Sequence, residues 1–561
     1  MRLKSKNITF DKPLVVFMFG ALLGFIVFFM LYGFECLNPF SMDWLLNRGD
    51  LQQHFIGWEF YRLSDWSFPI GVASNLAYPI GMPISFTDSI PLMAIPSKII
   101  ANTFGIDFQY FGIWSLINYI FMGAFSSLII RRWTKNAFFI VCSAIIFLIL
   151  PTFTMRVFGH TALSSQWLIL AAISLLLYQK NISTKKMEIP LWTILLCIAV
   201  CIHPYFFVMV TPVLLCSVIF FHKDWRKSLI KLFIPLISSI TIFWLIGGFY
   251  FKEVSADGLG EFAFDPLSLI TPMDWSYFLK DGQSIAISHE SLSYMGLGLI
   301  CASFGLFLMF IINFKKINNY AVEHIESKVR AKIVWCFIIM ICLLIISLSP
   351  KLHIAGAVVF DFQIPNFIYK IWATFRATAR LFWPLLYILV ILIIVMICKL
   401  TNRKIIFANV FISIVLFLQI LDIAQSNAFT AKVQNFKNIQ NYDYKPKLDI
   451  AKWSQAAENR KNIIFLDQID NDSFFELSYI AIQKNMTLNT GYFARSPGTK
   501  IVYYQENYIK SLKEESLDLS NNLFITKNPT LVQSLQKIGY EIIVIDSYSI
   551  ISKSTKSANN S

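Results

Sequence analysis

The sequence is poor in charge: 15% of its 561 residues are Asp, Glu, Lys or Arg, whereas 56% are hydrophobic and 16% are aromatic. Soluble proteins carry about a quarter charged residues, so this composition excludes an ordinary soluble enzyme and a disordered chain. The nine cysteines all lie in or beside apolar stretches and none follows Cys398, which excludes a disulfide scaffold. The sequence also lacks a P-loop, a dinucleotide-binding glycine motif, a G-x-S-x-G motif and zinc-ligand spacing.

The sequence has instead a series of apolar runs long enough, or nearly long enough, to cross a hydrocarbon core about 30 Å thick. The eleven runs are 14–34, 109–130, 137–155, 161–179, 190–203, 204–221, 230–251, 294–313, 333–349, 381–399 and 404–422. The pair that meets at His203 and Pro204 is short for two full spans and favours a broken or shallow helical hairpin. We therefore predict a polytopic α-helical membrane protein of about eleven spans.

The distribution of charge predicts the orientation. The segments assigned to the cytoplasm, with the basic residues flanking them, hold 22 Lys and Arg against 5 Asp and Glu, whereas the external loops before residue 422 hold 10 against 15. This asymmetry places the amino terminus inside and the carboxyl terminus outside. It also accounts for the net charge of +14 without nucleic-acid binding. No small-residue cleavage site follows the first run, so we expect it to be an anchor.

Three stretches between the spans are predicted to be external loops: 35–108, 252–293 and 350–380. The first is rich in aromatic residues, Gly and Pro, which predicts short amphipathic helices at the bilayer interface, one of them over 51–63. The second is richer in Gly and acidic residues and is typical of a mobile polar loop. The predicted domains of the chain are a cytoplasmic amino terminus at 1–13, a transmembrane domain at 14–422, an external α/β domain at 423–552 and a disordered tail at 553–561.

The α/β assignment rests on alternating patterns in the last part of the chain. Apolar β-branched runs predict strands at 463–466, 523–525 and 542–545, and amphipathic stretches predict helices at 473–484 and 530–538.

The apolar runs are nearly free of ionisable side chains, and His160 and His203 stand out within them. Ion-coupled transporters need charged residues at mid-membrane, so the scarcity of ionisable side chains in the apolar runs argues against a pump or an ion-coupled exporter. The polar residues concentrate on the predicted external face, where we look for chemistry.

Asp50 is the first candidate catalytic residue, because a carboxylate at a water–lipid boundary can act as a general base. The alternative is a helix N-cap for residues 51–63. Asp88 has the same ambiguity, because it can cap a helix that runs on from Ile90. Arg48 and His54 flank Asp50 and are assigned to the same first-loop site. Glu59 and Asp65, by contrast, are interpreted as solvated surface residues.

Arg376 and Arg380 lie four residues apart, which predicts two guanidiniums on one helix face at the external end of a span. Such a pair suits a lipid phosphate, and the alternative is snorkelling toward headgroups. Arg156 and His160 repeat this spacing at another external end, and His203 lies at the turn of the short hairpin. For the histidines, the alternative is a structural role.

These features resemble the GT-C type membrane glycosyltransferases, which take a sugar from a polyprenyl phosphate on the outer side of the membrane. Both have a cytoplasmic amino terminus, a span, an external loop with an early acidic residue, many further spans and a carboxyl-terminal external domain. The strings RGDLQQHFIGWEFYR, FTDSIPL, RVFGHTAL, HPYF and FRATARLFWP are similar to a bacterial branch of that superfamily. Among its functionally assigned groups, the Gtr-type enzymes that glucosylate O-antigen are nearest in character.

The resemblance implies an inverting transfer in which Asp50 deprotonates the acceptor hydroxyl. Arg376 and Arg380, with Arg156, His160 or His203, would neutralise the leaving phosphate. Asp50 is followed by Leu51 rather than by a second acid, so a second carboxylate, if needed, would come from elsewhere, such as Asp88. No cofactor is expected, because this departure from the paired acids of some GT-C enzymes weakens the case for a divalent metal.

The partners implied are a polyprenyl-phosphate-sugar donor, a polysaccharide or lipid-linked glycan acceptor, membrane lipid, and enzymes that make and flip the donor. The sugar implied is a hexose such as glucose, and the implied location is the bacterial inner membrane with the carboxyl-terminal domain in the periplasm. The alternative left open is a non-catalytic flippase or escort of a lipid-linked sugar. A phosphoethanolamine or acyl transferase is disfavoured, because no metal-ligand cluster or activated nucleophile is evident.

Overall fold

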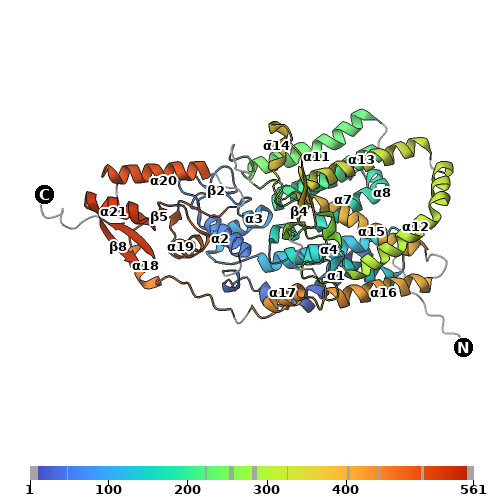
Figure 1. Ribbon diagram of the computed structural model, residues 1–561, viewed down its shortest axis with the longest axis horizontal. Helices are drawn as coiled ribbons and strands as arrows, with labels where there is room; N and C mark the ends of the chain where they lie inside the picture. Colours follow the sequence, from blue (N-terminus) through green and yellow to red (C-terminus); the bar gives the residue numbers. More distant parts are fainter. Residues whose placement is uncertain are drawn as a thin grey trace. The chain divides into compact units, whose positions relative to one another are not determined.

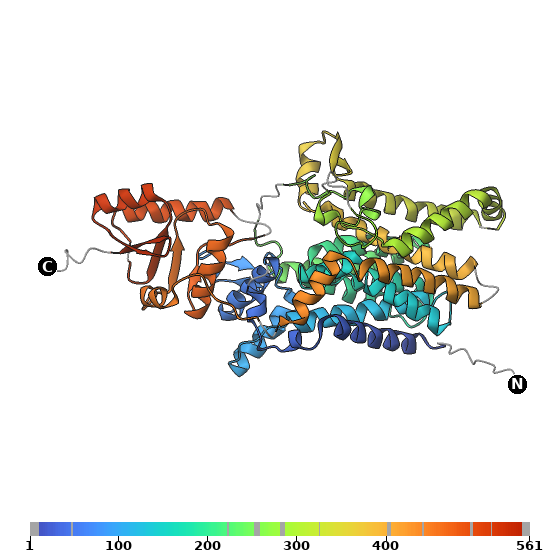
Figure 2. The same cartoon turned by 60° about the horizontal axis from the view of Figure 1, so that its bottom comes forward.

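The chain folds into two compact units, each assembled from separate stretches of sequence (Figures 1 and 2). The first unit comprises Met1–Asn38, Tyr110–Ile242 and Ala256–Gln440, and the second comprises Pro39–Gln109, Phe243–Ser255 and Asn441–Ser561. The computed structural model describes residues 11–46, 49–221, 224–251, 258–280, 287–324, 326–400, 405–439, 442–493, 498–517 and 519–552.

The first unit is built almost entirely from helices. In chain order its α-helices are α1 (Pro13–Tyr32), α4 (Phe111–Ile130), α5 (Ala137–Leu148), α6 (Pro151–Arg156), α7 (Trp167–Leu177), α8 (Gln179–Thr184), α9 (Glu188–Ile202), α10 (Pro204–Phe221), α11 (Trp225–Leu245, which ends in the second unit), α12 (Leu297–His324), α13 (Ser327–Leu348), α14 (Asn366–Ala373), α15 (Trp383–Leu400), α16 (Ile405–Ile423) and α17 (Asn427–Lys437). Short 3₁₀ helices η1 (Glu35–Leu37), η3 (Thr161–Ser164), η4 (Pro266–Leu269), η5 (His289–Ser291) and η6 (Thr378–Phe382) and a hairpin of β3 (Lys351–Ile354) and β4 (Ala357–Asp361) complete it.

Among the described residues, seven helices are long and apolar enough to cross a membrane, and four shorter apolar helices accompany them. Each of the eleven predicted runs coincides with one of these helices. The chain is therefore a multi-pass membrane protein. The break expected at His203 and Pro204 is present, because α9 ends at Ile202 and α10 begins at Pro204.

Two glycines explain the close packing of α1 on α4. A Cβ atom added at Gly20 would lie 2.4 Å from the backbone oxygen of Gly123, and one at Gly24 would lie 2.1 Å from that of Tyr119. Only glycine permits such a backbone approach, which is how helices associate where lipid provides no hydrophobic drive.

The second unit contains a five-stranded sheet of order β6-β5-β7-β9-β8. Its strands are β5 (Asn462–Phe465), β6 (Thr487–Leu488), β7 (Asn522–Thr526), β8 (Glu541–Ile545) and β9 (Tyr548–Ser552), and its helices are α18 (Ile450–Ala456), α19 (Asn471–Gln483), α20 (Gly498–Lys513) and α21 (Pro529–Ile538). β5 pairs in parallel with β6 and β7, and β9 is antiparallel to β7 and β8. The three expected strands and two expected helices lie where the sequence patterns put them, whereas α20 was not predicted.

The first loop is part of this same unit rather than a separate surface segment. It forms η2 (Asp43–Leu45), α2 (Asp50–Leu63), α3 (Pro91–Phe104) and a short hairpin of β1 (Val72–Ala73) and β2 (Met82–Pro83). Leu76 forms a parallel bridge with Leu488, because Leu488 donates its N–H to Asn75 and accepts one from Tyr78. The loop therefore extends the edge of the carboxyl-terminal sheet.

The expectation of an amphipathic interface helix over 51–63 is wrong. Every residue of α2 from Leu51 to Tyr61 is buried, because α2 packs against α3 and against α19 (Figure 1). A helix covered on all sides needs no apolar stripe, and the polar residues within it find partners inside the unit.

Candidate functional site

The first unit contains a cluster of charge around one carboxylate, Glu290. Arg380 donates from Nε to Oε2 of Glu290 at 2.7 Å and from Nη2 to Oε1 at 2.9 Å. Arg156 donates from Nη2 to Oε2 at 2.9 Å and from Nη1 to Oε1 at 3.3 Å. The Nε2 atom of His160 lies 3.6 Å from Oε1. We call these four residues the Glu290 cluster.

Local structure brings the Glu290 cluster together from three distant stretches. Arg156 is the last residue of α6, His160 precedes η3, and Arg380 lies in η6, just before α15. Glu290 lies in η5, where the Oγ of Ser288 accepts the N–H of Glu290 and fixes the turn. Sites assembled from the ends of several helices are typical of ligand pockets in helical bundles.

The Glu290 cluster is buried, and its charges are strongly coupled. The side chains of Arg156, Arg380 and Glu290 are 3%, 12% and 15% exposed, respectively. Burial by itself raises the pKa of Glu290, but Arg156, Arg380 and then His160 outweigh it and hold that pKa well below its usual range. Two guanidiniums against one carboxylate leave a net positive charge, and a buried positive charge at helix ends attracts anions.

Aromatic rings line the two guanidiniums. Arg380 lies over the ring of Tyr205, 5.2 Å from its centroid, and Arg156 lies 5.6 Å from that of Trp383. The hydroxyl of Tyr205 accepts the N–H of Ala377 at 3.0 Å, and the N–H of Tyr205 donates to Nδ1 of His203 at 3.2 Å. His203 is therefore joined to the Glu290 cluster through Tyr205.

The prediction that Arg376 and Arg380 share one helix face is wrong. α14 ends at Ala373 and η6 begins at Thr378, so the backbone leaves the helical path between the two arginines. Arg376 is exposed and lies 5.4 Å from the ring centroid of Phe262, whereas Arg380 turns to Glu290. Arg156 and His160 do not share a helix face either, because α6 ends at Arg156. Both residues nevertheless contact Glu290.

The second unit holds the acidic candidates. Asp50 is the first residue of α2, the cap position belongs to Gly49, and Asp50 is partly exposed. The capping alternative therefore fails for Asp50. It fails for Asp88 as well, because α3 is capped at Ile90 without a side-chain hydrogen bond. Asp88 adopts a left-handed backbone conformation with a φ of 53°, which is uncommon for a residue other than glycine and marks local strain.

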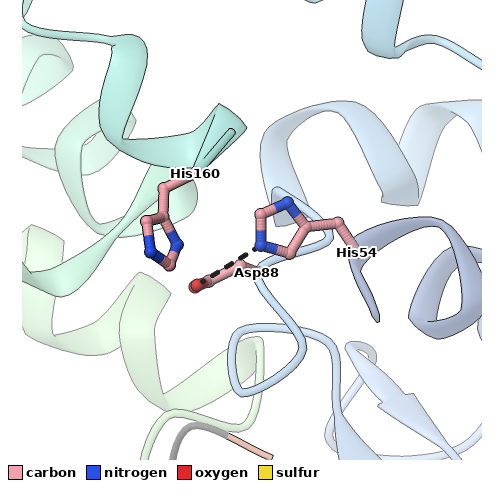
Figure 3. Close-up of side chains that lie close together, drawn as sticks. All are labelled: His54, Asp88 and His160. Carbon is pink, nitrogen blue, oxygen red and sulfur yellow. Dashed lines mark ion pairs between the residues drawn. The ribbon is translucent and has the colours of Figure 1, made fainter. Parts of the chain in front are cut away.

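His54 and Asp88 face each other in the second unit (Figure 3). The Nε2 atom of His54 lies 3.7 Å from Oδ2 of Asp88; the histidine is fully buried and the Asp88 side chain is 13% exposed. The hydroxyl of Ser89 donates to the backbone oxygen of His54 at 2.8 Å and exchanges a 2.7 Å hydrogen bond with Thr87. This network ties the strained Asp88 turn to α2.

Gly57 allows that contact. A Cβ atom at position 57 would lie 2.3 Å from Oγ1 of Thr87 and 2.5 Å from Oγ of Ser89, so a larger residue would push the Asp88 turn away from α2.

The remaining first-loop predictions had mixed outcomes. Glu59 is not a surface residue: its side chain is 5% exposed and pairs with Arg62 at 2.7 Å, and burial raises its pKa despite that partner. Asp65 is exposed, as expected. Arg48 lies outside the described residues.

Two functional candidates were missed by the sequence analysis. Glu290 lies in a stretch with many other acids, and nothing in its neighbourhood distinguishes it before its partners are known. Asp422 lies in the last turn of α16 and is fully buried. It accepts hydrogen bonds from the hydroxyl of Tyr294 at 2.6 Å, from the N–H of Leu297 at 2.9 Å and from Ser276. Asp422 thereby anchors the stretch that follows Glu290.

The chemistry available is divided between the units. The Glu290 cluster offers buried cationic donors that suit a phosphate, and the second unit offers carboxylates that can accept a proton, one of them beside a histidine.

Comparison with known proteins gives two family matches. The model described as "Domain of unknown function (DUF6311)" matches residues 21–424, and that described as "DUF6311 C-terminal domain" matches residues 452–553. No curated protein matches the sequence.

Among solved structures, the chain is similar to three structures of oligosaccharyltransferases from Archaeoglobus fulgidus. The oligosaccharyltransferase AglB in complex with an inhibitory peptide and a dolichol-phosphate is 13% identical, with a TM-score of 0.41 over 92% of this chain and 69% of that chain. The form tethered to an acceptor peptide is 12% identical, with a TM-score of 0.40 over 97% and 74%. The complex with Zn and sulfate is 11% identical, with a TM-score of 0.42 over 97% and 73%.

Proposed function

The chain belongs to the DUF6311 family, and we propose that it is a membrane glycosyltransferase that moves a sugar from a polyprenyl-phosphate donor to a glycan acceptor. The observation that carries this proposal is the Glu290 cluster. Buried charges among membrane helices are costly, and those retained are functional as a rule. Two guanidiniums, a histidine and aromatic rings at the ends of apolar helices provide what the phosphate of a membrane lipid requires.

The proposed reaction exchanges one bond to the anomeric carbon for another. A carboxylate of the second unit, Asp50 or Asp88, accepts the proton of the acceptor hydroxyl, and the hydroxyl oxygen forms the new bond to carbon 1 of the sugar. The bond from that carbon to the phosphate oxygen breaks, and its electron pair leaves on the polyprenyl phosphate. Attack opposite the leaving group inverts the configuration.

The arginines then have a defined task. Charge develops on the phosphate oxygen as the bond to the sugar breaks, and fixed donors placed where charge develops lower the barrier most. We assign this stabilisation to Arg380 and Arg156, with His160 and His203 in support. Arg376 is assigned to the first capture of the lipid phosphate, because its side chain is exposed and lies over the ring of Phe262.

Further details of the proposal rest on the sequence resemblance. The donor is an undecaprenyl-phosphate-linked hexose such as glucose, the acceptor is a cell-surface glycan such as O-antigen, and the place is the periplasmic side of a bacterial inner membrane. The carboxyl-terminal domain is external in this proposal, and no metal is required.

The test compares surface polysaccharide from cells that express wild type, Asp50→Asn, Arg380→Gln or an empty vector. Mass spectrometry of the repeat unit should show a hexose-sized increase with wild type and none with Asp50→Asn, Arg380→Gln or the empty vector. Asp65→Asn is the matched control, because Asp65 is an exposed carboxylate of the same unit, and it should behave as wild type.

An unchanged repeat unit in all cells, with expression confirmed, would contradict the proposal. Vesicles containing the purified protein and a fluorescent lipid-linked sugar then test the flippase alternative, which predicts movement of the lipid without a new glycosidic bond.

A further inference from the structure

A row of half-exposed aromatic rings lies in the second unit, outside the residues assigned to catalysis. It consists of Tyr444, Phe475, Tyr479 and Tyr492, which we call the aromatic strip. Phe475 and Tyr479 are four residues apart on α19 and so share one face of that helix. The ring of Tyr444 lies 5.2 Å from that of Tyr479, and the ring of Tyr492 lies 6.5 Å from that of Phe475.

The aromatic strip lies outside one hydrophobic cluster of the sheet. That cluster contains Ile464, Leu512, Phe524 and Leu535, and none of the four rings belongs to it. Phe475, Tyr479 and Tyr444 are half-buried, and Tyr492 is 38% exposed. Aromatic rings that stay partly exposed in a row can serve as a binding surface, because a tyrosine offers both a flat apolar face and a polar hydroxyl.

The aromatic strip is held against the helix that begins with Asp50. The side-chain amide of Gln53 donates to the backbone oxygen of Tyr492 at 2.9 Å. Asp50 lies three residues before Gln53, so both project from neighbouring positions on one side of α2. α19, which carries Phe475 and Tyr479, packs directly on α2 (Figure 2).

A carboxylate lies beside the other end of the aromatic strip. Burial and then the charge of Asp43, in η2, raise the pKa of Tyr479, and the backbone of Tyr444 hydrogen-bonds to Asp43. The surface therefore combines flat rings with carboxylates at its rim.

We propose that the aromatic strip binds the sugar rings of the acceptor glycan and leads the acceptor hydroxyl to Asp50. Pyranose rings present faces of C–H groups, which stack on aromatic rings, and rims of hydroxyl groups, which donate to carboxylates. A lipid chain would not use the carboxylates, and a phosphate would be repelled by them. This inference rests on the proposed function and adds the acceptor site to it.

The test measures binding and transfer with oligosaccharides released by mild acid from the lipopolysaccharide of the expression host. Tyr492→Ala should weaken oligosaccharide binding by the full-length protein about tenfold, equivalent to ~1.4 kcal/mol. The acceptor KM should rise by a similar factor, with the donor KM unchanged. Tyr492→Phe should stay close to wild type, because it keeps the ring.

Tyr503→Ala is the matched control. Tyr503 is a 60% exposed tyrosine on α20 of the same unit and is outside the aromatic strip, so its loss should change neither quantity. Equal thermal stability of the variants shows that each is folded.

The outcomes separate this inference from the proposed function. If transfer requires Asp50 but Tyr492→Ala has an unchanged acceptor KM, the aromatic strip does not bind the acceptor, and the proposed function is unaffected. If wild type transfers no sugar but binds the oligosaccharides through Tyr492, the proposed function is wrong, and glycan binding by the aromatic strip is supported. An absence of oligosaccharide binding by wild type would overturn the inference.

Discussion

Replacing Glu290 with glutamine tests whether the Glu290 cluster is an anion site held by its own carboxylate. The variant keeps the size of the side chain and removes the charge that two guanidiniums share, through contacts of 2.7 to 3.3 Å. Removing one partner of a buried ion pair costs about 3–5 kcal/mol, because the remaining charge stays buried without compensation. Arg156 is 3% exposed and Arg380 is 12% exposed, so solvent screens little of this cost.

We therefore expect Glu290→Gln to be destabilised by about 3 kcal/mol, which lowers the apparent melting temperature in detergent by several degrees. Inorganic phosphate should reverse part of the loss, because an anion that binds the two guanidiniums stabilises the folded state by mass action. A phosphate concentration 100 times its Kd supplies about 2.7 kcal/mol. Wild type, in which Glu290 neutralises the same guanidiniums, should respond less to phosphate.

Glu59→Gln is the matched control. It removes another buried carboxylate paired with an arginine, but Arg62 retains Asp107 at 2.5 Å. This variant should be destabilised without rescue by phosphate. Equal stabilisation of both variants by phosphate, or a wild-type melting temperature for Glu290→Gln, would refute the reasoning.

The pH dependence has a defined sign. The folded pKa of Glu290 lies below its unfolded value, so the carboxylate stabilises fully above about pH 4.5 and this contribution is lost as pH falls through the folded pKa. The stability of Glu290→Gln should therefore fall less than that of wild type as the pH is lowered through this range.

Three further predictions concern the reaction. Asp50→Asn should reduce transfer about 10²–10⁴-fold with little change in donor KM, because a general base acts in the chemical step. A reduction smaller than about 10²-fold would assign the base to Asp88 instead, and Asp88→Asn is assayed alongside. Arg380→Lys should lower kcat about 10²-fold, because an ammonium cannot reproduce the paired donors of a guanidinium, and a wild-type rate would remove Arg380 from the transition state. Incubation with EDTA followed by desalting should leave transfer unchanged, and restoration of a lost rate by Mg²⁺ or Mn²⁺ would show that the acids of this site hold a metal.

The helices and strands were largely predictable because their signals are local. An apolar run about twenty residues long specifies a helix by composition alone, and the short apolar runs that begin at Ile463 and Leu523 favour buried strands in the same way. The two arginines of the Glu290 cluster were also predictable, because Lys and Arg are less frequent at the external ends of spans than at the cytoplasmic ends.

What the sequence could not reveal depends on contacts between distant residues. Glu290 is one acid among several in its stretch, and only its position opposite Arg156 and Arg380 distinguishes it. The helical pairing expected for Arg376 and Arg380 failed because periodicity does not show where a helix stops short. The burial of α2 was missed because its cover, α19, lies about four hundred residues further along the chain.

The dependence of the first loop on the carboxyl-terminal sheet leads to a last prediction. The parallel bridge between Leu76 and Leu488, the hydrogen bond from Gln53 to Tyr492 and the packing of α19 on α2 all require residues beyond 440. A chain that ends at residue 440 should still insert into the membrane, because its apolar helices are complete, but it should lose transfer and be cleaved by protease within 39–109. A chain that ends at residue 552 is the control and should resist protease like wild type. Full activity of the shorter chain would show that Asp50 is positioned without the sheet, because the contacts that cover α2 would then be dispensable.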